Sequence, residues 1–550
     1  MPEAWAHLPQ WRVFDTDFGT GLHFLTLWRA WRADPQRPRL LHVVAITPEA
    51  TSTHTLASPE LAADLAAQWH GLLPGIHRLS FDNGRVLLTL CIGALEPMLR
   101  AQRFEADAIV FSGPAEAVKP AARFARRGTE LVARSDTPAV RDALAQNGFQ
   151  IEPSADAGEL RAVFAPAWTV RRRGPPPERL EAPGRCAVIG AGLAGAAVAN
   201  SLARRAWQVT VLDAADRAAA GASGLPVGML APHVSSDDAL LSRLTRAGIR
   251  ATWSELERLL EAGHDWRATG VLERRPDGDT RVPPGWSAEG PNESWPATAA
   301  QLASAALPPE SAAIWHARAA WVRPGALIAA WLKQPGVQLE TGAQVASLQR
   351  SGDGWRLKDA AGTTLAEVDR VVVAGGIGSA ALAAALPLQP VRGQLEWGRM
   401  DPADAALPVT PVNGDGHFVA HVPDADGAIW LTGATFDRDR RDPAPTAGDT
   451  EANRERLARL HPAAAAALTT TFAQGDARRW VGVRCASADR RPLVGPLDAV
   501  AMPGVWVSTA MGSRGLSFAA LCAELLAAQW HGEPLPLPAT LAKALHTTRR

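Results

Sequence analysis

Residues 186–213, which read CAVIGAGLAGAAVANSLARRAWQVTVLD, constrain the fold of this chain more than any other segment. A short apolar strand over Cys186–Ile189 leads through spaced glycines into an alanine-rich helix and a second strand over Gln208–Leu212. The glycines are Gly190, Gly192 and Gly195, and the second strand ends at Asp213. In such a unit the glycines permit a tight turn, close approach of backbone N–H groups to a pyrophosphate, and close packing of helix on strand. The acid about 20 residues further on accepts hydrogen bonds from ribose hydroxyls. We therefore expect an ADP-containing cofactor here, and the alternative is a structural glycine turn.

The length and composition indicate a large globular protein. A chain of 550 residues holds three or four domains of ordinary size or two large ones. Its residues are 47% hydrophobic and 20% charged, and no run approaches the roughly 18 apolar residues that a membrane span requires. The first residues lack the basic and apolar regions of a secretory signal. The four cysteines lie far apart, without the spacing of a zinc site or a disulfide framework. These features predict a cytoplasmic protein without a metal.

The charge is balanced, with 56 basic and 56 acidic residues, so the chain as a whole does not have the charge typical of a nucleic-acid-binding protein. Local clusters such as Arg171–Arg173 are candidates for phosphate contacts. The alternative is that they are solvated side chains of a linker.

The chain divides at a segment rich in proline and charge, residues 171–184, which we interpret as a linker. In residues 1–170, expected strands such as Leu40–Ile46 and Ala108–Phe111 alternate with expected helices such as Pro59–Leu73 and Thr137–Asn147. This alternation predicts a parallel, doubly wound α/β sheet. Residues 185–550 begin with the cofactor-binding unit and form the second part.

Several separated motifs make the second part resemble the glycine oxidase and D-amino-acid oxidase family of flavoproteins. They are GASG (221–224), VVVAGG (371–376), VRGQ (391–394), GVRCASADRRPLVG (482–495) and MGSRGLSFA (511–519). More closely, these motifs together with PVGMLAP, WVRPGAL and LTGATFD are similar in order to the oxidoreductase half of the bifunctional tRNA methylaminomethyl-uridine biosynthesis family. Residues 18–32 and 164–173 resemble segments of the methyltransferase half of the same family.

The resemblance implies two Rossmann-like domains. Residues 1–170 would be a methyltransferase-like domain that binds S-adenosylmethionine. Residues 185–550 would be an FAD-dependent oxidoreductase, with the FAD-binding parts at about 185–235, 320–385 and 480–535 and a β-rich substrate subdomain at 236–319 and 386–479. The implied partner is tRNA. The implied reaction removes the carboxymethyl group from 5-carboxymethylaminomethyl-(2-thio)uridine at the wobble position, and methylation of the resulting amine would follow.

The same resemblance assigns site residues. Arg484 would hold the substrate carboxylate, because a guanidinium can bind a carboxylate through two parallel hydrogen bonds; the alternative is a salt bridge to Asp489. Arg392 and Arg514 are further candidates near the flavin ring or the substrate. The expected FAD-binding residues are Gly190, Gly192, Gly195, Asp213, Ser223, Gly224, Gly512, Ser513, Arg514, Gly515 and Leu516. Leu225 departs from the family, which has Asn after GASG, and no catalytic base is evident.

The first half departs from the family at three places. Asp17 replaces the first glycine of the turn that would pass under S-adenosylmethionine, although Gly19 and Gly21 remain. Thr47 replaces the Glu that would accept the ribose hydroxyls. Ser112 lies in the segment where the family has an Asp beside the reacting amine, and that Asp is absent here. We therefore expect weak or absent methyl transfer. In the alternative interpretation, Glu49 supplies the acid and the backbone still holds the cofactor.

Three functions remain open from the sequence. The first is modification of the wobble uridine of tRNA with a degenerate methyltransferase-like half. The second is oxidation of a small amine or amino acid, and the third is a non-catalytic tRNA-binding flavoprotein.

Overall fold

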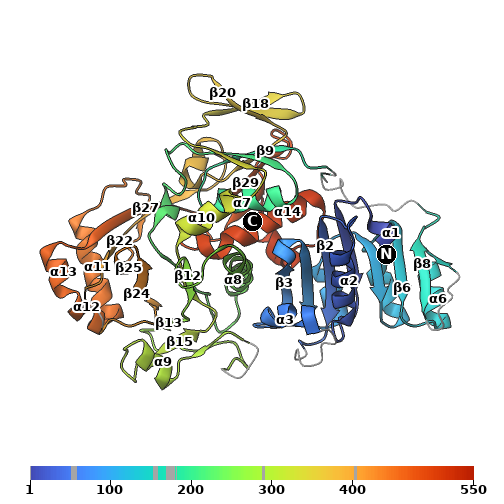
Figure 1. The fold of residues 1–550 in the computed structure, drawn as a ribbon, viewed down its shortest axis with the longest axis horizontal. Helices are drawn as coiled ribbons and strands as arrows, with labels where there is room; N and C mark the ends of the chain where they lie inside the picture. Colours follow the sequence, from blue (N-terminus) through green and yellow to red (C-terminus); the bar gives the residue numbers. More distant parts are fainter. Residues whose placement is uncertain are drawn as a thin grey trace. The chain divides into compact units, whose positions relative to one another are not determined.

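A computed structural model describes residues 2–50, 59–152, 159–168, 180, 182–287, 292–401 and 406–549. The chain forms two compact units (Figure 1). Unit 1 contains Met1–Ala182 and Leu525–Lys543, and unit 2 contains Pro183–Glu524 and Ala544–Arg550. Most of the predicted linker lies outside the described residues. Within the described ranges, no helix has both the length and the apolar character needed to cross a membrane.

Unit 1 is built on an eight-stranded sheet with the order β3-β4-β2-β1-β5-β6-β8-β7. The strands are β1 (Gln10–Asp15), β2 (Leu40–Thr47), β3 (Gly75–Phe81), β4 (Val86–Ile92), β5 (Ala106–Phe111), β6 (Ala125–Ala133), β7 (Phe149–Glu152) and β8 (Leu160–Phe164). The five central strands pair in parallel, whereas β3, β7 and β8 add antiparallel edges. The order reverses at β1, as in doubly wound folds. The predicted α/β class is therefore confirmed, with antiparallel edges that were not predicted.

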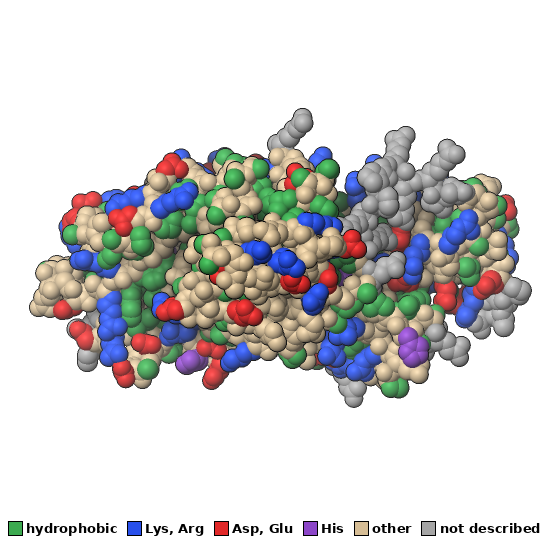
Figure 2. Space-filling view, turned by 90° about the horizontal axis from the view of Figure 1, so that it is seen from above, with side chains coloured by type: hydrophobic (Ala, Val, Ile, Leu, Met, Phe, Trp, Pro, Cys, Tyr) green, Lys and Arg blue, Asp and Glu red, His purple; other side chains and the backbone are tan. Residues whose placement is uncertain are grey.

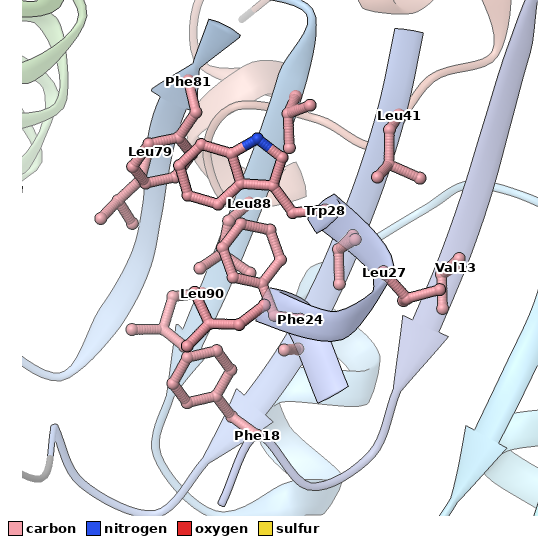
Figure 3. Close-up of a cluster of buried hydrophobic side chains, with 14 of the residues drawn as sticks. Val13, Phe18, Phe24, Leu27, Trp28, Leu41, Leu79, Phe81, Leu88 and Leu90 are labelled. Atoms are coloured by element: carbon pink, nitrogen blue, oxygen red, sulfur yellow. The ribbon is translucent and has the colours of Figure 1, made fainter. Parts of the chain in front are cut away.

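The two faces of this sheet carry separate apolar cores because side chains alternate along each strand. Val13 of β1 belongs to one core and its neighbour Phe14 to the other. The first core receives α2 (Leu22–Ala33) and α3 (Pro59–Ala67), and the second receives α4 (Leu95–Ala101), α5 (Val118–Ala122) and α6 (Pro138–Gln146). Figure 3 shows the first core, in which Phe24 and Trp28 of α2 face Leu79, Phe81, Leu88 and Leu90 of β3 and β4.

Residues 525–543, far along the chain, complete unit 1. They include the end of α14 (Gly515–His531) and α15 (Ala539–Lys543). The guanidinium of Arg12 donates to the carbonyl of Gly532 at 3.2 Å, and that of Arg78 donates to the carbonyl of Pro534 at 2.7 Å. Trp530 is buried in this segment. Residues 1–182 and residues 525–543 thus share one folded unit.

Unit 2 contains a six-stranded sheet with the order β17-β10-β9-β21-β29-β28. Its strands are β9 (Arg185–Ile189), β10 (Gln208–Leu212), β17 (Val337–Glu340), β21 (Arg370–Val373), β28 (Leu493–Pro496) and β29 (Val505–Thr509). All pairs are parallel except β28 with β29. The packing helices are α7 (Leu193–Arg204), α10 (Pro324–Leu332) and the start of α14, which lie close to this sheet in Figure 1.

A nine-stranded, largely antiparallel sheet forms the second layer of unit 2. It contains β13 (Val271–Arg274), β14 (Ser294–Pro296), β15 (Ala313–His316), β22 (Gln389–Arg399), β23 (Val412–Gly414), β24 (Gly416–Asp424), β25 (Gly427–Gly433), β26 (Asp437–Arg438) and β27 (Arg478–Ala486). Figure 1 shows α11 (Ala447–Leu460), α12 (Pro462–Ala467) and α13 (Thr469–Gln474) gathered beside β22, β24 and β25.

Smaller elements complete unit 2. Two three-stranded sheets consist of β11 (Gly228–Leu230), β16 (Ala320–Val322) and β12 (Trp266–Ala268), and of β18 (Ser347–Ser351), β19 (Gly354–Lys358) and β20 (Thr364–Val368). Helix α8 (Leu240–Leu259) packs against the start of α14, the short α9 (Ala299–Ser304) packs on the antiparallel sheet, and α1 (Pro2–Trp5) begins unit 1.

Candidate functional site

The turn between β9 and α7 has backbone constraints that only glycine meets. Gly190 has a φ of 109°, and a Cβ there would lie 2.7 Å from the Cα of Gly375. A Cβ on Gly195 would lie 1.8 Å from the carbonyl oxygen of Gly190. Gly192 is the N-cap of α7, and a Cβ there would approach Ser223. The N-terminus of this helix therefore carries the short, close-packed turn that a pyrophosphate-binding site requires.

Two polar side chains hold this turn. The carboxylate of Asp213, directly after β10, accepts the N–H of Ala191 at 2.6 Å and the N–H of Ala215 at 2.9 Å. The hydroxyl of Ser223 accepts the N–H of Leu193 at 3.1 Å. Both side chains line a cavity, so the acid at the end of the second strand is fixed beside the glycine turn.

The cavity has a volume of about 900 Å³ and lies entirely within unit 2. This is within the range of about 300–1,000 Å³ that ligand pockets occupy. The glycine turn and Asp213 line one part of it, and His233, Glu273, His417, Phe436 and Arg484 line another. The cavity therefore joins a nucleotide-binding turn to a group of charged and aromatic side chains.

The segment before α14 forms a further wall of the cavity. Residues Met511, Gly512, Ser513, Arg514, Gly515 and Leu516 all line it. Gly512 has a φ of 58°, and its N–H donates to the carbonyl of Cys485 at 2.8 Å. Helix α14 begins at Gly515, so its positive N-terminal end faces the cavity. Ser223 and Leu225 also line the cavity, whereas Gly224 between them does not. A Cβ on Gly224 would lie 2.3 Å from the carbonyl of Ala219, so the backbone of this segment also requires glycine there.

Arg484, on β27, lines the cavity without an acidic partner among the described residues. Its guanidinium donates one long bond, 3.4 Å, to the carbonyl of Thr435. Gly393 makes room for it, since a Cβ there would lie 2.4 Å from the terminal nitrogen. The carboxylate of Asp489, the alternative partner, instead pairs with Arg491 and Arg549. Burial lowers the pKa of the Arg484 guanidinium, which leaves a desolvated cation facing the cavity.

The other two predicted arginines differ. Arg514 lines the cavity, and burial lowers the pKa of its guanidinium. Arg392 does not line it: its side chain is fully buried and pairs with Asp449 at 2.7 Å, and it donates to the carbonyls of Asp442 and Ala444. The structure therefore does not bring Arg392 to the predicted site, and its bonds instead tie residues 437–449 to β22.

Several polar residues of the cavity were not predicted from the sequence. Glu273 accepts a hydrogen bond from the buried His316, which also contacts the hydroxyl of Ser294 at 2.9 Å. The pKa of Glu273 is lowered by its bond from His316, although burial opposes the shift. Desolvation and the charge of Arg484 lower the pKa of His417 to about 4. An acid within the apolar strand Val271-Leu272-Glu273 was the only sequence signal for this group.

In unit 1, the loop after β1 is closed by its own hydrogen bonds. The carboxylate of Asp17 accepts the N–H of Gly19 at 3.1 Å, and both Gly19 and Gly21 have positive φ values. The hydroxyl of Thr47 donates to the carbonyl of Glu49 at 2.7 Å, and the N–H of Ser112 donates to the hydroxyl of Thr16 at 2.7 Å. The glycine turn is thus present, and the side chains of Asp17 and Thr47 are both hydrogen-bonded to the backbone of their own loops.

Two general features complete the description. The described residues contain no group of three or more His, Cys, Asp and Glu side chains arranged to hold a metal ion. Figure 2 shows basic and acidic side chains interspersed on the face it presents, as expected for a chain without net charge.

Comparison with known proteins gives consistent results. The model of the family "FAD dependent oxidoreductase" matches residues 185–529. The tRNA 5-methylaminomethyl-2-thiouridine biosynthesis bifunctional protein MnmC of Polaromonas naphthalenivorans is 47% identical and covers 99% of this chain and 91% of its own. The protein of the same name from Delftia acidovorans is 46% identical, and the match covers 100% of this chain and 93% of the relative.

Solved structures share the fold of unit 2. Glycine oxidase from Geobacillus kaustophilus superimposes with a TM-score of 0.53 at 21% identity and covers 67% of this chain and 99% of its own. Iminodiacetate oxidase from Chelativorans gives a TM-score of 0.51 at 22% identity, and the match covers 64% of this chain and 97% of the oxidase. At these identities the likeness concerns the fold. The chain belongs to the family of tRNA 5-methylaminomethyl-2-thiouridine biosynthesis bifunctional proteins, and residues 185–529 belong to the FAD-dependent oxidoreductases.

Proposed function

We propose that this protein oxidatively removes the carboxymethyl group from 5-carboxymethylaminomethyl-(2-thio)uridine at the wobble position of tRNA, leaving 5-aminomethyl-(2-thio)uridine. The observation that carries the proposal is Arg484, a desolvated cation without an acidic partner among the described residues, which lines the same cavity as the nucleotide-binding turn. The substrate's N-substituted glycine presents a carboxylate of the kind that such a cation binds. The family membership supplies the tRNA context.

The glycine turn and the segment before α14 fit FAD. Gly190, Gly192 and Gly195 would admit the pyrophosphate at the N-terminus of α7, and Asp213 would accept the ribose hydroxyls. Ser223 lines the same cavity and Gly224 follows it in the chain, and Gly512 to Leu516 would contact the ring end at the N-terminus of α14. When bound, FAD supplies an acceptor for the two electrons and the hydrogen of a C–H bond.

The chain's own residues would bind and orient the substrate. Arg484 would hold the carboxylate, so that the glycine methylene is fixed relative to the ring. Oxidation converts the C–N bond of that methylene to an imine, and water then splits the imine into aminomethyl-uridine and glyoxylate. Arg514 and Glu273 line the same cavity and would be charged neighbours of the substrate's amine. Arg392 is a structural residue in this proposal.

We further propose that unit 1 transfers methyl groups weakly or not at all. The position of Asp17 in the turn and the bond of Thr47 to the backbone support this proposal. In this view, residues 1–170 persist as a methyltransferase-like scaffold that helps to dock tRNA, and residues 185–550 carry the oxidoreductase. If Glu49 supplies the missing acid, S-adenosylmethionine would still bind.

A cytoplasmic location follows from the tRNA substrate. The four cysteines support it, because all are buried and none forms a disulfide.

The test is mass spectrometry of nucleosides from tRNA that carries carboxymethylaminomethyl-uridine, after incubation with the purified holoenzyme with and without S-adenosylmethionine. We expect aminomethyl-uridine and glyoxylate, and we expect aminomethyl-uridine to persist when S-adenosylmethionine is present. Arg484→Gln should slow the oxidation about 100-fold at unchanged flavin content, whereas Arg399→Gln, at an exposed position, should not.

Other outcomes would select other functions. Conversion to methylaminomethyl-uridine would contradict the proposal for unit 1. An unchanged tRNA together with flavin reduction by N-alkylglycines would indicate a small-amine oxidase. An unchanged tRNA without any flavin reduction would indicate a non-catalytic tRNA-binding flavoprotein.

A further inference from the structure

An exposed aromatic ring stands in the wall of the cavity. Phe436 follows β25 in the LTGATFD motif and lines the cavity with 51% of its surface exposed. The ring lines the same cavity as Arg484, so a ligand that is held by Arg484 can reach it.

Two arginines lie near this ring. The guanidinium carbons of Arg484 and Arg438 each lie 5.9 Å from the centroid of Phe436. Arg484 is partly buried, and Arg438 is exposed. The ring is thus close both to a desolvated cation of the cavity and to a cation in contact with solvent.

The backbone on both sides of Phe436 is held by β22. The N–H of Thr435 donates to the carbonyl of Gln394 at 3.0 Å, and its hydroxyl accepts the N–H of Gln394 at 2.9 Å. On the other side, Asp437 and Arg438 form β26, which pairs with Val391 and Arg392 of β22. The side chain is therefore exposed on a fixed backbone, an arrangement that favours binding because little order must be gained.

We propose that Phe436 is a stacking platform for the pyrimidine ring of the wobble nucleotide, while Arg484 holds the carboxylate of its side chain. This inference rests on the proposed function and adds to it the group that recognises the base. Single-stranded RNA bases are commonly bound by stacking on aromatic side chains. A small N-alkylglycine has no such ring and gains nothing from Phe436.

The spacing agrees with the chemistry of the substrate. Four single bonds separate the carboxyl carbon from C5 of the uracil ring, a span of about 5 Å when extended. The 5.9 Å between Arg484 and the centroid of Phe436 is of the same order. One substrate can therefore place its carboxylate at Arg484 and its base against Phe436. Arg438 is exposed near the ring, and it could contact a neighbouring phosphate of the RNA.

The test compares Phe436→Ala and Phe436→Trp with the wild-type holoenzyme in anaerobic flavin-reduction kinetics. The concentration of tRNA carrying carboxymethylaminomethyl-uridine is varied to separate the apparent Kd from the limiting rate of reduction. Phe436→Ala should raise the apparent Kd roughly 10- to 100-fold, with a smaller change in the limiting rate. Phe436→Trp should restore binding because its ring also stacks.

Two controls make the result specific. Val500→Ala removes an apolar side chain of unit 2 that is 91% exposed and lies outside the cavity, and it should leave the Kd unchanged. Reduction by N-ethylglycine at high concentration should be the same in wild type and Phe436→Ala. Equal flavin content and absorbance spectra verify that the variants are folded.

An unchanged Kd for tRNA in Phe436→Ala, or failure of the Trp variant to bind better than the Ala variant, would overturn the stacking role. If wild-type enzyme itself does not oxidise the tRNA, the proposed function fails instead. The two failures are therefore distinguishable.

Discussion

The imidazole of His417 lies near the guanidinium of Arg484 in the cavity. Desolvation and the positive charge of Arg484 lower the pKa of His417 to about 4. At neutral pH the imidazole therefore carries no charge and does not compete with Arg484 for an anionic ligand.

This shift predicts a loss of stability in acid. In the unfolded chain His417 would bind a proton below its ordinary pKa of about 6.5, whereas in the folded chain it remains neutral down to about pH 4. The unfolded state thus binds more protons in this window, and stability falls as the pH drops from about 6.5 towards 4. The contribution of one group is at most about 1.4 kcal/mol per pH unit.

Urea unfolding of the holoenzyme at several pH values checks this expectation. His417→Gln cannot titrate, so its free energy of unfolding should depend less on pH than that of the wild type between pH 6.5 and 4. Parallel curves for the two proteins would show that His417 does not titrate as described. Other buried histidines with lowered pKa values, such as His461, contribute equally to both proteins.

At the scale of elements, the β9–α7–β10 unit depends on contacts too short for any side chain. Gly195→Ala places a methyl group 1.8 Å from the carbonyl of Gly190 in the present backbone. The helix must then move away from the strand, at a cost of about 1–3 kcal/mol or more. We expect this variant to lose most of its flavin, measured as the absorbance ratio of flavin to protein after purification.

Gly325→Ala is the matched control. This residue lies in α10 of unit 2, and a Cβ there would have no neighbour within 4 Å. It should keep full flavin content and gain slightly in stability, since alanine favours a helix over glycine. Retention of flavin by Gly195→Ala would mean that the turn tolerates a wider helix-to-strand distance.

The bounds of these local elements were predicted most accurately from the sequence. The strands around the glycine turn were predicted within one residue, because apolar runs and glycines act locally. The helix expected over Pro59–Leu73 ends at Ala67, before Gly71 with its positive φ. The cavity's walls at Glu273 and His417 come from strands far apart in the chain. No local pattern specifies such pairings, so these residues were missed. The ion pair of the buried Arg392 with Asp449 could not be predicted from the sequence either.

At the scale of the whole molecule, the two units should respond differently to their expected cofactors. A ligand that binds the folded state alone stabilises it by about 2.7 kcal/mol at a concentration 100 times its Kd. FAD should therefore raise the Tm of the unfolding transition of unit 2. S-adenosylmethionine at millimolar concentration should change no transition by more than about 1 °C, because Asp17 and Thr47 do not provide its contacts.

Scanning calorimetry of the full chain measures both effects. The double variant Asp17→Gly, Thr47→Glu restores a glycine and an acid and should respond to S-adenosylmethionine more than the wild type. A shift of several degrees in the wild type would show that unit 1 binds this cofactor and would favour Glu49 as the acid.

The assignment of residues 525–543 to unit 1 has a consequence for biosynthesis. On the ribosome, domains usually fold as they emerge, the N-terminal one first. Here the first unit lacks the carbonyls of Gly532 and Pro534, which accept from Arg12 and Arg78, until all of Pro183–Glu524 has been translated. The nascent chain would therefore carry a first unit without its C-terminal segment through most of its synthesis, and this unit could be completed only after the last helices leave the exit tunnel.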